Sequence, residues 1–91
     1  MTILCIDSGN TRIKWGLHDG SRWAALGAAG HEEADRLERE WATLPAPAIV
    51  AAANVAGGHA EARIAAAAAR WNCGVRWLQA VESACGVRNL Y

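Results

Sequence analysis

The sequence predicts an α/β fold built on one mixed β-sheet, with the element order βββαβαβ. Three short segments with the character of strands open the chain and are joined by tight turns. After them, apolar segments alternate with segments of helical periodicity. Tight turns join antiparallel strands, whereas strands separated by helices pair in parallel. The sheet is therefore expected to begin antiparallel and to continue parallel.

The antiparallel opening rests on three strand segments and two turns. Residues 2–7 are apolar on both faces, which places this strand in the centre of the sheet. Residues 11–19 alternate apolar and polar side chains, as a half-buried strand does. Gly9-Asn10 lies between them and tolerates positive φ, as a hairpin turn requires. Asp19-Gly20 predicts a second hairpin, which leads into a third strand near 22–27.

The later elements follow from helical periodicity and from chain-breaking residues. A helix is expected near 31–43, because Leu37, Trp41 and Leu44 recur at helical spacing and two prolines follow. Beyond it we expect a strand at 48–53, a loop at 54–58, a helix at 59–71, a strand at 75–78 and an extended segment at 86–91. We expect the five tryptophans in the core, namely Trp15, Trp23, Trp41, Trp71 and Trp77.

Composition and charge exclude several classes of function. The formal net charge is zero, whereas a non-specific nucleic-acid binder shows a basic excess. No apolar run approaches the roughly 20 residues that span a bilayer, and the first residues lack the features of a signal peptide. Cys5, Cys73 and Cys85 have neither metal-ligand nor redox-motif spacing. We therefore expect a cytoplasmic protein that binds neither nucleic acid nor a membrane.

The segment 7–14 is the part of the sequence best suited to bind a polyphosphate. Asp7 ends the first strand and can hold Mg²⁺ directly or through water. Gly9 allows phosphate oxygens to approach the backbone, and the next two side chains offer donors. Lys14 is the only lysine of the chain, beside eight arginines, and can reach a terminal phosphate. The alternative is an ordinary hairpin turn, because Asp, Gly and Asn are the residues that turns favour.

The run Asp7-Ser8-Gly9-Asn10-Thr11-Arg12-Ile13-Lys14-Trp15-Gly16 resembles the first phosphate motif of type III pantothenate kinases, also called the Bvg accessory factor family. Residues 53–57 and 86–91 resemble two further segments of that family. The resemblance implies the fold of the actin, Hsp70 and sugar-kinase superfamily, which is ribonuclease H-like. Residues 1–91 would then be a single, incomplete N-terminal half-domain of a larger actin-like ATPase.

The resemblance also implies a reaction and a set of contacts. The reaction is ATP-dependent phosphorylation of pantothenate to 4'-phosphopantothenate, the first step of coenzyme A biosynthesis. Tyr91 is expected to contact pantothenate, with Asn54 as a second candidate. Asp7 is expected to hold Mg²⁺ through water, and family members also use a monovalent cation (K⁺ or NH₄⁺) and form homodimers. The ATP phosphates are expected to contact Asp7, Ser8, Gly9, Asn10, Thr11, Arg12, Ile13 and Lys14.

The same resemblance places the catalytic aspartate beyond Tyr91, so no catalytic residue is expected within the chain. The 91 residues alone are therefore expected not to phosphorylate pantothenate. Three alternatives remain open at this point. The protein could be a non-catalytic accessory or regulatory protein of the same fold, another small-molecule kinase or phosphatase of the superfamily, or a small α/β domain without a ligand, since a fold does not name a substrate.

Overall fold

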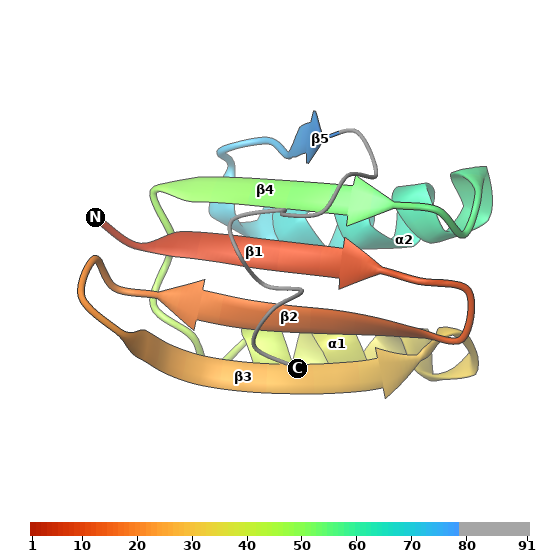
Figure 1. Ribbon diagram of the computed structural model, residues 1–91, viewed down its shortest axis with the longest axis horizontal. Coiled ribbons are helices and arrows are strands. Elements are labelled where there is room, and N and C mark those ends of the chain that lie inside the picture. The colour runs from red at the N-terminus through yellow and green to blue at the C-terminus, as the bar shows by residue number, and fades with distance from the viewer. Residues whose placement is uncertain (79–91) are drawn as a thin grey trace.

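The computed structural model describes residues 1–78, which contain one five-stranded sheet with the order β3-β2-β1-β4-β5. Both α-helices lie behind this sheet in the view of Figure 1, so a single face of the sheet carries them. The strands are β1 (Ile3–Ser8), β2 (Arg12–His18), β3 (Trp23–Gly30), β4 (Ile49–Asn54) and β5 (Arg76–Leu78). The helices are α1 (Ala34–Trp41) and α2 (Gly58–Ala68), with the 3-10 helices η1 (His31–Glu33) and η2 (Ala69–Trp71).

The pairing of the strands confirms the predicted mixed sheet. β1 lies at the centre, antiparallel to β2 and parallel to β4. β3 continues the antiparallel side, and β5 continues the parallel side. The central position of β1 follows from its sequence, because Leu4, Cys5 and Ile6 are all at most 1% exposed and their side chains point to both faces.

The core lies between the sheet and the two helices. Trp41 of α1 is fully buried and packs edge-on against Trp15 of β2, with ring centroids 6.3 Å apart. Ile64 of α2 is equally buried. The alanines of α2 on the same side are buried as well, and their small side chains let the helix lie close to the sheet. Within residues 1–78, no helix has the length and apolarity needed to cross a bilayer.

Two strand glycines provide space for large side chains on opposite faces of the sheet. A Cβ atom at Gly27 would lie 2.4 Å from Cζ2 of Trp15, so the indole of Trp15 covers this glycine on the helix side. A Cβ atom at Gly16 would lie 2.6 Å from Cζ3 of Trp23 on the other side. Each glycine is therefore required by the packing of a tryptophan from the neighbouring strand.

Several predictions about individual elements need correction. β3 extends to Gly30 rather than ending near residue 27, because its pairing with β2 continues to Arg12. The helix predicted from residue 31 begins as the 3-10 turn η1 and ends at Trp41. Trp23 packs against His18 outside the core, and Trp77 is 37% exposed. The segment 86–91, including Tyr91, lies outside the described residues.

Candidate functional site

The predicted phosphate-binding segment is the hairpin between β1 and β2. Asp7 on β1 lies opposite Lys14 on β2, and Ser8 lies opposite Ile13. The Gly9 N–H donates to the Arg12 carbonyl over 3.0 Å and closes the turn. Three residues, 9–11, therefore connect the strands and project beyond the edge of the sheet.

The backbone of this turn differs from the prediction. Among the described residues, positive φ angles occur at Gly20, Gly57, Asn72 and Gly74, and not at Gly9 or Asn10. The two-residue turn with left-handed φ was therefore wrong, since a three-residue connection reverses the chain without it. A Cβ atom at Gly9 would meet the Arg12 carbonyl oxygen at 3.7 Å, an ordinary contact. The folded chain itself thus leaves room for a side chain at Gly9.

The alternation of strand residues divides the motif between the two faces of the sheet. Asp7 and Lys14 face away from the helices, whereas Ser8 and Ile13 are buried on the helix side. Ser8 Oγ is buried there without a hydrogen-bond partner in the described part of the chain. A ligand on the open face can therefore contact only the backbone groups of Ser8 and Ile13.

The remaining six residues of the motif surround a hollow of about 230 Å³, which we call the hairpin hollow. Its lining is Asp7, Gly9, Asn10, Thr11, Arg12 and Lys14. Two cationic side chains stand against one carboxylate, so the lining carries a net positive charge. A hydroxyl, a side-chain amide and the turn backbone add donors, which is the set of groups that phosphate oxygens require.

The residues present also fit a hydrated magnesium ion. Within residues 1–78 no cluster of three or more His, Cys, Asp or Glu side chains forms a metal cage. Asp7 is the acidic residue of the hairpin hollow. Because Mg²⁺ keeps several waters and is commonly held by one or two carboxylates together with substrate phosphates, a single aspartate suits it.

Asn54 ends β4 beside Ser8 and so lies at the same edge of the sheet. Its Nδ2 donates to the Gly57 carbonyl over 2.8 Å, and its Oδ1 accepts from the Ala56 N–H over 3.0 Å. These bonds fix the loop that leads into α2. The side chain of Asn54 thus serves the local turn, which is one of the two roles that the sequence left open.

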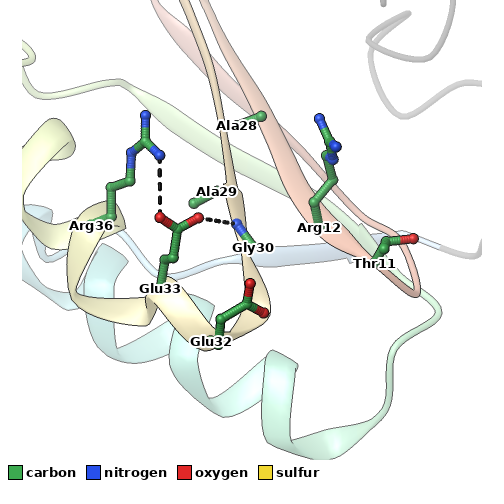
Figure 2. Close-up of a pocket in the computed structure, with 8 residues that line it drawn as sticks. All are labelled: Thr11, Arg12, Ala28, Ala29, Gly30, Glu32, Glu33 and Arg36. Carbon is green, nitrogen blue, oxygen red and sulfur yellow. Dashed lines mark hydrogen bonds and ion pairs between the residues drawn. The ribbon is translucent and has the colours of Figure 1, made fainter.

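A second hollow of about 290 Å³ shares Thr11 and Arg12 with the hairpin hollow, and the sequence did not indicate it (Figure 2). Thr11 and Arg12 line it from the hairpin, Glu33 lines it from η1, and Arg36 lines it from α1. Glu33 accepts from the Gly30 N–H over 3.0 Å and pairs with Arg36. Glu33 follows Gly30, the last residue before the helical turn, by three positions. A glutamate at this spacing is a capping signal that could have indicated this side of the hollow from the sequence.

The second hollow has no excess of positive charge, because Arg12 and Arg36 in its lining are matched by Glu32 and Glu33. Arg36 binds Glu40 over 3.0 Å and Glu33 over 3.4 Å, and these two carboxylates, Glu40 foremost, raise the pKa of Arg36 above its usual value. Its guanidinium is thus engaged by the helix itself. A phosphate is better accommodated in the hairpin hollow, where the cations outnumber the carboxylates.

His31 is a further residue of the site that the sequence did not identify. Its Nε2 lies 2.6 Å from the carbonyl oxygen of Gly9. The two residues are 22 positions apart, and the contact forms because β3 ends beside the hairpin turn and leads directly into η1. No local sequence pattern could have shown it.

Comparison with a solved structure identifies the fold. The chain superposes on a structure of Thermus thermophilus RuvC with a TM-score of 0.66 at 19% identity, over 87% of this chain and 62% of that chain. The chain therefore has the ribonuclease H-like α/β fold, as predicted, with its polar hairpin at the carboxyl end of the central strand.

Comparison of sequences then identifies the family. A family model described as type III pantothenate kinase matches residues 3–91. Proteins described by the same words are similar to this chain: one from Nitrosospira multiformis is 44% identical over 98% of the chain, and one from Dechloromonas aromatica is 48% identical over 98%. This chain belongs to the type III pantothenate kinase family. It spans about a third of the length of these relatives, 34% and 37% respectively.

Proposed function

We propose that residues 1–91 form the N-terminal part of a kinase that transfers the γ-phosphoryl group of ATP to pantothenate. The observation that carries this proposal is the hairpin hollow, in which Asp7, Lys14 and the turn backbone surround one positively charged space. Membership of the type III pantothenate kinase family supports pantothenate as the acceptor. The match to the N-terminal third of the relatives supports a larger protein.

Within this proposal the described residues bind and orient the triphosphate. Lys14 and Arg12 offset the charge of the phosphate oxygens, and the turn at Gly9 lets them approach the backbone. Mg²⁺, held by Asp7 through water, would neutralise charge on the phosphates. Phosphoryl transfer is mostly positioning and charge neutralisation, so this hairpin would contribute to both. We propose that the base lies beyond Tyr91.

The proposal extends to the parts of the site that lie outside the described residues. By resemblance to the family, Tyr91 contacts pantothenate, a monovalent cation (K⁺ or NH₄⁺) assists, and the complete protein is a homodimer. Asn54 is a weaker candidate for substrate contact, because its amide already holds the loop before α2.

The Asp7→Asn variant of the complete protein tests the proposal. We expect pantothenate-dependent ADP release to fall at least about 100-fold, because a charge that positions the metal and phosphates is lost. The Asp35→Asn variant is the matched control, since Asp35 is an exposed residue of α1 that pairs with Arg39 on the same helix. Normal kinetics for Asp7→Asn, with both variants folded, would refute the assignment and favour a non-catalytic accessory role.

A further inference from the structure

The turn that forms the hairpin hollow is anchored at one peptide group. The carbonyl oxygen of Gly9 lies 2.6 Å from Nε2 of His31, on the helix side of the sheet where η1 leads into α1. A carbonyl oxygen can only accept, so Nε2 must carry the proton and donate it. The N–H of the same glycine is bound by the Arg12 carbonyl. Both backbone polar groups of Gly9 are thus fixed.

His31 is itself held in place from two sides. The guanidinium of Arg63, on α2, donates to the backbone carbonyl of His31. The residue before it, Gly30, has its N–H bound by Glu33. His31 is partly buried between these contacts. A continuous set of hydrogen bonds therefore leads from α2 through η1 to the turn of the hairpin.

The anchored carbonyl determines where the next amide points. In a planar trans peptide the C=O and the following N–H point in opposite directions, and the described residues contain no cis peptide. Because His31 holds the Gly9 carbonyl toward η1, the Asn10 N–H is directed away from η1. Asn10 is one of the residues that line the hairpin hollow. Its amide is thus presented as a fixed donor rather than as one of several orientations.

We propose that His31 is a positioning residue for phosphate binding, which orients the Gly9–Asn10 peptide so that the Asn10 N–H meets a phosphate oxygen of a nucleoside triphosphate. This inference rests on the function proposed above. It assigns no chemical step to the imidazole, which acts through the backbone of the turn. A preoriented donor does not have to be ordered when the anion binds, so its loss weakens the binding of the phosphate ligand specifically.

Steady-state kinetics of three variants of the complete protein test this inference. His31→Leu removes the donor, His31→Gln restores an N–H donor at the end of a side chain, and His59→Leu removes an exposed histidine of α2 as the control. We expect His31→Leu to raise the KM for ATP about 2- to 10-fold, the range that corresponds to one net hydrogen bond. The KM for pantothenate should change by less than about twofold. His31→Gln should return the KM for ATP most of the way to the wild-type value.

Amide exchange of the ligand-free protein gives a readout that does not depend on catalysis. In His31→Leu the Gly9 amide, which donates to the Arg12 carbonyl, should exchange faster because the turn has lost its anchor, whereas the amide of Lys14 within β2 should keep its protection. An unchanged KM for ATP in His31→Leu would overturn the inference. A parallel rise of both KM values with a lowered Tm and no recovery by His31→Gln would also overturn it, because that pattern indicates general destabilisation.

The failure of this inference can be distinguished from the failure of the proposed function. If the wild-type protein releases ADP in the presence of pantothenate and Asp7→Asn does not, the function stands whatever His31→Leu shows. If the wild-type protein shows no turnover of ATP, the proposed function fails, and the positioning role fails with it.

Discussion

Replacing Gly9 by alanine separates the needs of the fold from the needs of the ligand. In the structure φ at Gly9 lies outside the left-handed region, and the added Cβ would approach the Arg12 carbonyl oxygen no closer than 3.7 Å. Alanine can therefore adopt this conformation without strain. By restricting the unfolded chain, it should raise the free energy of unfolding by about 0.4–1 kcal/mol.

The same methyl group would stand in the hairpin hollow, where the backbone is expected to meet phosphate oxygens. A displacement of the phosphates on the order of 1 Å lowers the rate by about 100-fold. The expected result for Gly9→Ala is thus an equal or higher stability, measured by chemical denaturation, together with a kcat/KM for ATP about 100-fold lower.

The Gly58→Ala variant is the matched control. Gly58 is the first residue of α2, and no atom lies within 4 Å of the position of its Cβ. This variant should gain stability in the same way and leave the kinetics unchanged. If Gly9→Ala keeps the wild-type kcat/KM, no phosphate approaches the backbone there and the reasoning is refuted. If it is clearly less stable than the wild type, the steric argument is refuted.

Three further predictions concern stability. Gly27→Ala should lower the free energy of unfolding by about 1–3 kcal/mol, because its Cβ would lie 2.4 Å from the indole of Trp15; a wild-type urea midpoint would contradict this packing. Leu37→Ala should lower it by about 2–5 kcal/mol, since Leu37 is 1% exposed in the core, and a loss below 1 kcal/mol in the same titration would contradict that burial. The pKa of Asp19 is lowered to about 2, chiefly by the N–H of Ser21, so its contribution to stability is complete above the usual value of 3.8 and is lost as the pH falls toward 2. Acid unfolding of Asp19→Asn should show less pH dependence in that window, and an identical profile would refute the assignment.

The sequence predicted the strand order of the sheet's opening because its signals are local. A continuous apolar run gave the central strand β1, and the alternation of 11–19 gave β2 with Trp15 directed to the core. The end of β3 was missed because Ala28–Gly30 lacks side chains of strong β-propensity. Its extended form there depends on pairing with β2, which is a tertiary contact.

The candidate site was predictable in its residue types but not in its geometry. Asp7 and Lys14 were predicted to contact the phosphates and the metal, and the register of β1 and β2 places them opposite one another. The same alternation places Ser8 and Ile13 on the buried face. The contact from His31 to Gly9 spans 22 residues and joins η1 to the turn between β1 and β2, so no pattern near either residue specifies it.

Chemical labelling of Lys14 tests the central claim most directly, because it is the only lysine among these 91 residues. The complete protein would be treated with an amine-reactive reagent with and without Mg·ATP, and the peptide that contains Lys14 would be quantified by mass spectrometry. Our account predicts that Mg·ATP slows the modification of Lys14, since the amine would lie against a phosphate in the hairpin hollow. Equal modification at saturating Mg·ATP would contradict the assignment of this hairpin as the phosphate site.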